Sequence, residues 1–208
     1  MELWSPAYNN QDIKIKSAET VYDGHYQVVK LTMKHKCFNG DWSDWLEREQ
    51  LLREDAACAI LWDPQQDKIV LVEQVRVGLI NKKCQASPWM IEIVAGLIDK
   101  GETPEDAIVR EAKEEAGFEI KTLLPIGVFF NTPGGFNEKS FVYCGIISLV
   151  TDKVACSPDE DEDIKVHIFD WVDFQTFHNT VVTSASTLIA VQWLTHHHDV
   201  LREKYATI

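Results

Sequence analysis

Hydrophobic and polar residues alternate near the start of the chain with the two-residue period of β-strands. Residues 12–36 contain two such runs, IKIKSAETVYDG and HYQVVKLTMKHK, and Asp23-Gly24 at their junction is a dipeptide typical of tight turns. The pattern predicts a β-hairpin or a small sheet. A second turn dipeptide, Asn39-Gly40, introduces the segment WLEREQLLRED.

Longer apolar runs begin after residue 50. ACAILWD and KIVLVEQVRV are separated by the polar turn PQQD, which predicts two adjacent core strands. The segments 89–99, 118–131 and 139–150 are also strand-like, whereas 103–117 has the pattern of a helix. A closing helix is predicted from about Ser184 to Tyr205, with apolar residues at helical spacing at Leu188, Val191, Leu194, Val200 and Leu201.

These elements predict an α+β sandwich preceded by a small β module. A chain of 208 residues is long enough for one ordinary domain with a full core and a small extra module. We find no low-complexity linker and no internal repeat, so the boundary is a change of pattern. We expect an N-terminal β module at residues 1–50 and a larger domain at residues 51–208.

Charge and composition narrow the classes of function. The formal net charge of -13 argues against a protein that grips nucleic acid through its phosphates, because such binding needs clustered Lys and Arg. An anionic substrate therefore requires local cations or metal ions to offset repulsion. No apolar run reaches the ~20 residues that span a bilayer, and the N-terminus lacks a signal-peptide layout. We expect a cytoplasmic protein without a membrane partner.

Neither the cysteines nor the histidine run predicts a site. The five cysteines are odd in number and scattered without a C-x-x-C pair, so we expect reduced, mostly structural thiols. The run His196-His197-His198 lies in the pattern of the closing helix, where consecutive residues point about 100° apart. We therefore interpret it as a polar helix face rather than a metal site.

The helix predicted at residues 103–117 has well-placed ends but an unusual charge pattern. Thr103 can cap its start, and Gly117 supplies the stop. The last turn of a helix favours Lys or Arg, yet this one carries Glu114 and Glu115, with Glu111 one turn earlier. Each like-charge pair at this spacing costs roughly 0.2–0.5 kcal/mol on an exposed helix.

Two interpretations of these carboxylates remain open at this point. Arg110 and Lys113 can serve as ordinary surface partners, and for an isolated E-x-x-E-E pattern a solvated helix face is the better interpretation. Carboxylates that converge without enough basic partners instead suit hard cations such as Mg²⁺ or Mn²⁺, which keep waters and bridge to substrate phosphates.

The residues around these carboxylates resemble the signature of a known family. From Gly96 to Phe118 the chain reads GLIDKGETPEDAIVREAKEEAGF, and every fixed position matches the Nudix box, G-x5-E-x7-R-E-U-x-E-E-x-G-U, where U is a bulky apolar residue. Ala112 departs from the pattern at the first U, which is a packing position. The chain also resembles the bacterial-type ADP-ribose pyrophosphatases in the segments FNG, WLEREQLLRED, EQVRV, SPWMIEIVAG, NTPGGFNEKS and PDEDEDIKVH.

The resemblance implies a Nudix α/β/α sandwich whose box is a loop-helix-loop that binds Mg²⁺, with Mn²⁺ as an alternative. Glu102 and Arg110 are expected to brace this loop through an ion pair. Such metals neutralise pyrophosphate oxygens and lower the pKa of a bound water. Matched residue by residue, the expected ligands are the backbone carbonyl of Ala95 and the carboxylates of Glu111 and Glu115, with Glu114 at the edge of the cluster.

The acidic run at residues 159–163 supplies a candidate general base. Most such runs are solvated loops. In the resembled enzymes, however, a loop of the pattern x-E-x-E-D provides the base and a further metal ligand, which places the base at Glu160 and the ligand at Glu162. A base must lie within hydrogen-bond reach of the attacking water.

The resemblance also assigns substrate contacts in the larger domain. Arg76 matches a residue that contacts the diphosphate, although taken alone it reads as a surface residue. Leu97 matches a backbone contact beside the metal loop. A loop on the terminal ribose side is matched by Thr132, Pro133, Gly134 and Glu138, although Pro-Gly-Gly alone is ordinary turn chemistry.

In the resembled family the N-terminal β module swaps across a two-fold dimer. The resemblance therefore implies a homodimer in which this module contributes to the substrate site. His25 and Tyr26 are expected against the adenine, although Tyr26 is equally compatible with a core position. Arg48, Glu49 and Arg53 are expected to complete the site.

Together these features predict an enzyme that converts ADP-ribose and water to AMP and ribose 5-phosphate. A second hypothesis keeps the chemistry but changes the substrate to a sugar nucleotide, NADH or a dinucleoside polyphosphate. A third is a Nudix-like ligand sensor without catalysis, and the intact Glu111, Glu114 and Glu115 argue against it.

Overall fold

The computed structural model describes residues 4–80, 87–149, 163–182 and 184–206 of the chain. They form two compact units. The first unit consists of the residues up to Arg53 together with Phe130–Glu138, and the second of Glu54–Phe129 together with the residues from Lys139 onward. The first unit is therefore built from two segments that are distant in the sequence.

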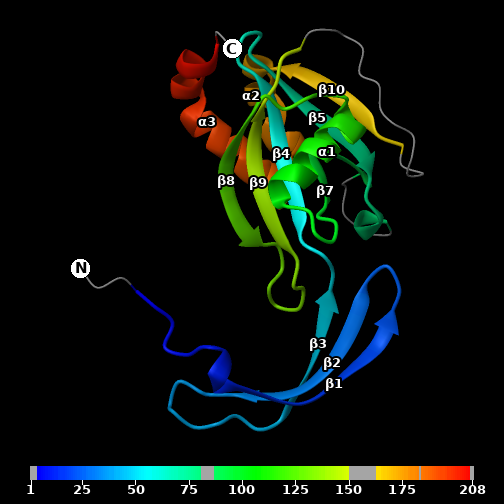
Figure 1. Ribbon diagram of the computed structural model, residues 1–208, viewed down its shortest axis with the longest axis vertical. Coiled ribbons are helices and arrows are strands. Elements are labelled where there is room, and N and C mark those ends of the chain that lie inside the picture. Colours follow the sequence, from blue (N-terminus) through cyan, green and yellow to red (C-terminus); the bar gives the residue numbers. More distant parts are fainter. Residues whose placement is uncertain (1–3, 81–86, 150–162, 183, 207–208) are drawn as a thin grey trace. The chain divides into compact units, whose positions relative to one another are not determined.

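An antiparallel sheet forms the body of the first unit. It contains β1 (Ile13–Asp23), β2 (Gln27–His35) and β3 (Leu46–Leu52), in the order β1-β2-β3 (Figure 1). A short 3-10 helix, Asn10–Asp12, precedes it. β1 and β2 pair from Ile13 with His35 to Asp23 with Gln27, so the hairpin predicted around Asp23-Gly24 is confirmed.

The segment Phe130–Glu138 joins the first unit through β3. The Leu51 amide donates to the carbonyl of Gly135 at 2.7 Å, and the Asn137 amide donates to the carbonyl of Leu51 at 3.2 Å. Since these bonds extend the backbone ladder beyond the edge of the sheet, the segment is held like a short extra strand. This pairing lies beyond what the sequence pattern predicted.

The second unit is built on a mixed sheet. Its main path is β10-β5-β4-β9-β8, and within the described residues β6 and β7 add to it beside β5 and β4. The adjacent pair predicted from the two apolar runs is confirmed as β4 and β5. The strands are β4 (Ala56–Asp63), β5 (Lys68–Val75), β6 (Trp89–Glu92), β7 (Val94–Leu97), β8 (Thr122–Phe130), β9 (Lys139–Ile146) and β10 (Lys165–Asp170).

β4 pairs with two different strands along one edge. Its second half, Leu61 to Asp63, pairs with β5, whereas its first half, Ala56 to Ala59, pairs with β7. The single strand predicted at residues 89–99 is therefore two strands with different partners. They part at Ile93, whose backbone amide donates to the hydroxyl of Thr187 at 3.0 Å.

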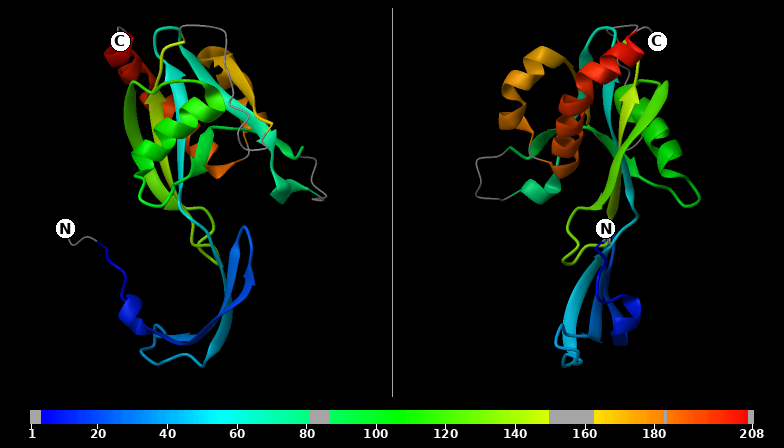
Figure 2. Two further views of the ribbon diagram at one scale, coloured as in Figure 1. Left: turned by 45° about the vertical axis from the view of Figure 1, so that its right-hand side comes forward. Right: turned by 90° about the vertical axis from the view of Figure 1, so that its left-hand side faces the viewer.

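Helices cover both faces of this sheet, as Figure 2 shows. α1 (Pro104–Ala116) packs on one face, and α2 (Trp171–Val181) and α3 (Ala185–Tyr205) pack on the other. The alternation along β4 explains both layers, because successive side chains point to opposite faces. Cys58, Ile60 and Trp62 join the core with α2 and α3, whereas Ala57, Ala59 and Leu61 join the core with α1. The predicted α+β sandwich is confirmed.

β10 and α2 were not predicted from the sequence. β10 has only exposed and half-buried residues at the edge of the sheet, without strict alternation, and it follows an acidic run that gives no strand signal. α2 begins directly after it, without a side-chain hydrogen bond from Asp170 at its cap. Its buried residues, Trp171 and Phe174, are held by tertiary packing in the α2 and α3 core.

The predicted closing helix is confirmed as α3, but part of its predicted apolar pattern faces solvent. Val200 is 71% exposed, whereas Leu194 is fully buried. The interpretation of the histidine run as a polar face is wrong for His198. Its Nε2 lies 2.7 Å from Oδ1 of Asp67, and its ring stacks on Trp171 at 5.2 Å, so it belongs to the packed side of the helix.

Two further expectations concern thiols and membranes. In the part of the chain that the structure describes, Cys37 and Cys144 are free thiols, Cys58 is buried, and burial raises the pKa of Cys144 to about 12. No described helix is both long and apolar enough to cross a membrane.

The packing of α3 predicts a contrast between two of its residues. Leu194→Ala should destabilise the protein by about 2–5 kcal/mol, because it leaves a cavity in a fully buried position. Val200→Ala should change stability by less than about 0.5 kcal/mol, because its side chain is largely in water. Urea denaturation of both variants measures the difference, and equal losses would contradict this packing.

Candidate active site

α1 has the ends that its sequence predicted. The Thr103 hydroxyl accepts a hydrogen bond from the Asp106 amide at 3.1 Å, and Pro104 occupies the first turn. Gly117 ends the helix in the left-handed conformation with φ 74°, where a residue with a Cβ atom is strained. These ends fix the helical register and therefore the direction in which each glutamate of the box points.

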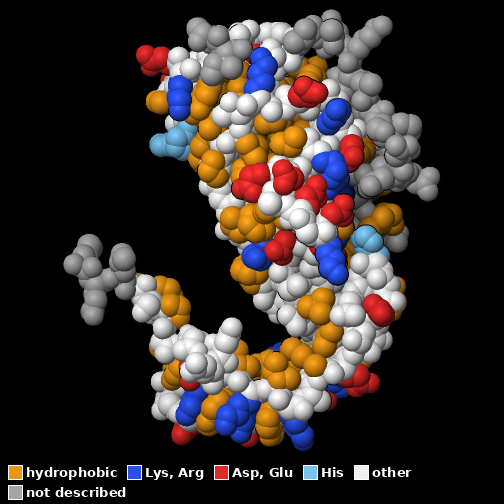
Figure 3. All heavy atoms as spheres, viewed as in Figure 1, with side chains coloured by type: hydrophobic (Ala, Val, Ile, Leu, Met, Phe, Trp, Pro, Cys, Tyr) orange, Lys and Arg blue, Asp and Glu red, His pale blue; other side chains and the backbone are white. Residues whose placement is uncertain are grey.

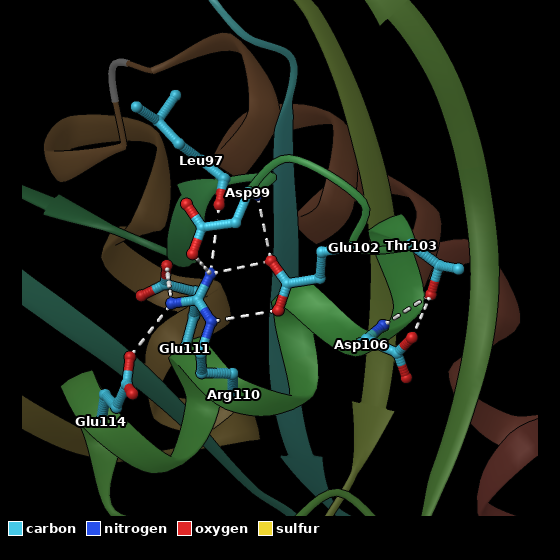
Figure 4. Close-up of polar contacts among 8 residues, drawn as sticks. All are labelled: Leu97, Asp99, Glu102, Thr103, Asp106, Arg110, Glu111 and Glu114. Carbon is cyan, nitrogen blue, oxygen red and sulfur yellow. Dashed lines mark hydrogen bonds and ion pairs between the residues drawn. The ribbon is translucent and has the colours of Figure 1, made fainter.

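The Arg110 guanidinium is the centre of a polar cluster on α1 (Figure 4). Its Nε and Nη2 donate to the two carboxylate oxygens of Glu102, each at 3.1 Å, which confirms the predicted ion pair. Nη2 also donates to the carbonyl of Leu97 at 3.2 Å. The hydrogen bonds to Glu102 raise the pKa of Arg110, and the same bonds lower the pKa of Glu102.

The same guanidinium contacts two of the glutamates predicted at the metal site. Its Nη1 donates to Glu111 at 2.6 Å and to Glu114 at 3.0 Å. Arg110 is therefore also an ordinary basic partner of these glutamates, which is one of the two interpretations that the sequence allowed. One positive charge is shared among several carboxylates, so the local charge stays negative.

Glu111 and Glu115 both approach the backbone at Ala95 and Gly96. Glu115 is 8% exposed, and its Oε2 accepts from the Ala95 amide at 3.2 Å. Glu111 lies so close to Gly96 that a Cβ atom added there would overlap its carboxylate. Glycine is therefore required at Gly96 by the carboxylate that lies against it.

These groups fit a divalent metal ion of the Mg²⁺ type. All the donors are hard oxygens, namely two carboxylates and a backbone carbonyl, and Gly96 leaves room for the Glu111 carboxylate against β7. Among the described residues, no group of three or more His, Cys, Asp or Glu side chains is arranged to hold a metal ion. The predicted ligand Glu162 and the predicted base Glu160 lie outside the described residues.

Arg76, predicted to contact the diphosphate, follows β5 and forms an ion pair with Glu92 of β6. Glu92 is 9% exposed, and sequence reasoning missed it. The two residues are brought together because β5 pairs with β6, so the signal lies in strand register rather than in a motif. Glu92 therefore holds the Arg76 guanidinium in place.

Predicted substrate residues also meet within the first unit. The Arg53 guanidinium lies over the Tyr26 ring, and its Nη1 donates to the Tyr26 hydroxyl at 3.2 Å. Glu138 is 8% exposed and lies 3.8 Å from the same Nη1. The Nε of Arg53 is buried and has no hydrogen-bond partner in the described structure. An unpaired buried donor of this kind is costly unless a ligand supplies an acceptor.

The remaining predicted contacts of the first unit differ in exposure. The His25 ring lies edge-on to Tyr26 at 4.9 Å. Arg48 and Glu49 are exposed on β3, and Arg48 donates to its neighbouring carbonyl at Glu47. The loop residues Thr132, Pro133 and Gly134 are exposed and form a turn, closed by hydrogen bonds from the amides of Gly135 and Phe136 to the carbonyl of Thr132.

Comparisons with known proteins agree with this geometry. A family model described as NUDIX domain matches residues 52–191. The ADP-ribose pyrophosphatase of Escherichia coli K12 is 35% identical over 206 residues, covering 96% of this chain and 95% of that protein. The ADP-ribose pyrophosphatase of Haemophilus influenzae is 33% identical over 201 residues, covering 95% and 93%.

The crystal structure of a protein described as an ADP compounds hydrolase shares the fold. It superposes with a TM-score of 0.69 at 19% identity, and the match covers 96% of this chain and 100% of that one. The family model spans the sheet, α1, α2 and the first turns of α3, and within it Glu115 of α1 accepts from the backbone amide of Ala95. The chain belongs to the Nudix family.

Proposed function

We propose that this protein is a Mg²⁺-dependent hydrolase that cleaves the diphosphate of ADP-ribose to give AMP and ribose 5-phosphate. The observation that carries the proposal is the convergence of Glu111 and Glu115 on the backbone at Ala95 and Gly96. The choice of substrate is supported by relatives named ADP-ribose pyrophosphatase, whose sequences match this chain over nearly its whole length.

Each group near α1 has a part in this proposal. Glu111, Glu115 and the Ala95 carbonyl would hold the metal, which when bound would neutralise diphosphate oxygens and make a water more acidic. Mn²⁺ is an alternative to Mg²⁺. Arg110, clamped by Glu102, keeps Glu111 and Glu114 in place against their mutual repulsion.

The proposed general base is Glu160, and Glu162 is proposed as a further metal ligand. Both assignments rest on the match of the acidic run to the family pattern. A carboxylate base removes a proton from the attacking water in the transition state, which contributes typically about 10²–10⁴-fold to the rate.

Substrate recognition is proposed to involve Arg76 and the Leu97 backbone in the second unit. In the first unit it involves His25, Tyr26, Arg48, Glu49, Arg53 and the loop residues Thr132, Pro133, Gly134 and Glu138. The unpaired buried Nε of Arg53 supports this, because a ligand oxygen can satisfy it. The N-terminal β module is further proposed to mediate a homodimer, and the protein is proposed to be cytoplasmic, without nucleic-acid or membrane partners.

A related substrate is the second candidate. Another nucleoside diphosphate derivative, such as a sugar nucleotide, NADH or a dinucleoside polyphosphate, places the same diphosphate at the same carboxylates. A non-catalytic ligand sensor is disfavoured, because the box retains Glu111, Glu114 and Glu115 in a converging arrangement.

A hydrolysis panel with product identification tests the reaction and its carboxylates together. With Mg²⁺, the wild-type protein should convert ADP-ribose to AMP and ribose 5-phosphate faster than it hydrolyses the other diphosphates. Glu115→Gln should lose at least about 100-fold in turnover. Mutation of residues that only hydrogen-bond to a metal ligand already costs about 10–100-fold in metal affinity or activity. Glu119→Gln, a matched change at an exposed carboxylate just past the helix, should retain activity. Near-normal turnover of Glu115→Gln at saturating Mg²⁺ would rule out the metal site.

Gly96→Ala tests the close approach of Glu111 to the loop. The added methyl group would overlap the Glu111 carboxylate, so we expect a loss of about 10–100-fold in activity from its displacement. Gly127→Ala on β8 is the control, because an added Cβ there meets nothing within 4 Å. Steady-state kinetics and circular dichroism separate lost chemistry from lost fold. Wild-type kinetics for Gly96→Ala would contradict the described position of Glu111.

A metal titration distinguishes the roles of Glu160 and Glu162. Glu160→Gln should lower kcat by about 10²–10⁴-fold with little change in KM and without rescue by added metal. Glu162→Gln should be partly rescued by raised Mg²⁺, and Asp159→Asn should have little effect. If Glu160→Gln is rescued and Glu162→Gln is not, the two roles are exchanged. If neither change matters, the base lies elsewhere, and Glu138 is the next residue to test.

A further inference from the structure

Lysine side chains and two tryptophan rings share one face of the sheet in the first unit. Lys14 of β1 and Lys34 of β2 are cross-strand partners. The ammonium groups of Lys14, Lys34 and Lys36 lie 4.5, 5.3 and 5.1 Å from the centre of the Trp42 ring. Those of Lys16 and Lys34 lie 5.9 and 4.9 Å from the Trp45 ring. We call these six residues the lysine–tryptophan face; Figure 3 shows Lys and Arg side chains gathered among hydrophobic ones on this unit.

The positive charge of this face is not neutralised within the described structure. No carboxylate among the described residues forms an ion pair with Lys14, Lys16, Lys34 or Lys36, although the chain has an excess of acidic residues and a net charge of -13. Lys30 on the same strand shows the contrast, because it pairs with Glu47 at 3.0 Å.

Nearby acidic side chains are engaged in loop contacts instead. Asp12 accepts from the Asn9 amide at 3.0 Å, and Asp41 accepts from the side-chain amide of Asn39 at 3.1 Å. Like charges that face each other across strands repel, so the pairing of Lys14 with Lys34 works against the sheet. The indole faces attract ammonium groups but carry no net charge. The two indole rings therefore hold the lysine side chains in place without neutralising their positive charge, which can still attract an anion.

The contacts between the lysines and the indole rings indicate which kind of anion the lysine–tryptophan face can bind. The ammonium groups lie over the two rings, so the ring faces are not free to stack on nucleobases. An array of fixed ammonium groups is instead suited to several oxyanions in a row, because lysine binds phosphate as a strongly hydrated point charge.

We propose that the lysine–tryptophan face binds a small anion that carries several consecutive phosphate groups. Its six residues belong to the first unit, whereas α1 belongs to the second, and the proposal does not depend on the proposed hydrolytic activity. The face contains none of the residues assigned to metal or substrate.

Titration calorimetry with inorganic tripolyphosphate at low ionic strength tests the site. EDTA is present, so that the carboxylate site holds no metal to bind phosphate. The wild-type protein should bind, and the double variant Lys14→Gln/Lys34→Gln should bind at least about tenfold more weakly, as expected for lost charge-assisted hydrogen bonds. Lys204→Gln is the matched control, because it also removes a lysine that lies over one ring, that of Tyr205 at 4.9 Å. It should bind like the wild type.

A tryptophan variant and a check of folding show whether a loss of binding comes from the face itself or from unfolding. Trp42→Leu retains every lysine but removes the ring that orders three of them, and it should also weaken binding. All variants should keep the circular dichroism spectrum of the wild type, and the double lysine variant should not melt earlier, since it relieves repulsion.

The proposal is overturned if the wild-type protein does not bind tripolyphosphate, or if the double variant and Lys204→Gln bind equally well. Co-sedimentation with vesicles that contain anionic lipid provides a second arm. Lysine-dependent vesicle binding without tripolyphosphate binding would overturn the proposal in favour of a membrane surface. Lysine-dependent binding of tripolyphosphate, with weak or absent vesicle binding, is the expected result.

Discussion

Repulsion among the carboxylates of α1 is the constraint on which the site depends. Glu102, Glu111 and Glu114 share a single guanidinium, that of Arg110, which also holds the carbonyl of Leu97. Arg110 therefore ties the helix to the loop before it while leaving the neighbourhood negative overall. A helix with fully compensated charges would be more stable by a few tenths of a kcal/mol per pair, roughly, but would have less affinity for a cation.

The sheet gives this cluster a rigid support. β4 is buried on both faces, and along one edge it pairs first with β7 and then with β5. Ala95 and Gly96 lie in β7, which is thus held by backbone hydrogen bonds to a central strand rather than by loop contacts. Sites supported by regular elements keep their geometry better than sites on loops, and the backbone here is one of the groups that we assign to the metal.

The sequence predicted the parts of the molecule that depend on local chemistry. The cap at Thr103, the stop at Gly117 and the ion pair of Glu102 with Arg110 follow from spacing along one helix and its motif. β10 and α2 did not follow, because their buried side chains are selected by tertiary packing. The partnership of Arg76 with Glu92 depends on strand register, and that of Arg53 with Tyr26 joins residues 27 positions apart. Neither leaves a periodic signal.

The hydrogen bond from Ile93 to Thr187 links the junction of β6 and β7 to the start of α3. Thr187 is fully buried in the first turn of α3, and Ile93 stands where β6 gives way to β7. The start of α3 therefore anchors the backbone just before β7, the strand in which the Nudix box begins. Fraying of α3 from its own start would release Ile93 and loosen β7 on β4, so a lesion almost 70 residues downstream of the box could behave as damage to the carboxylate cluster.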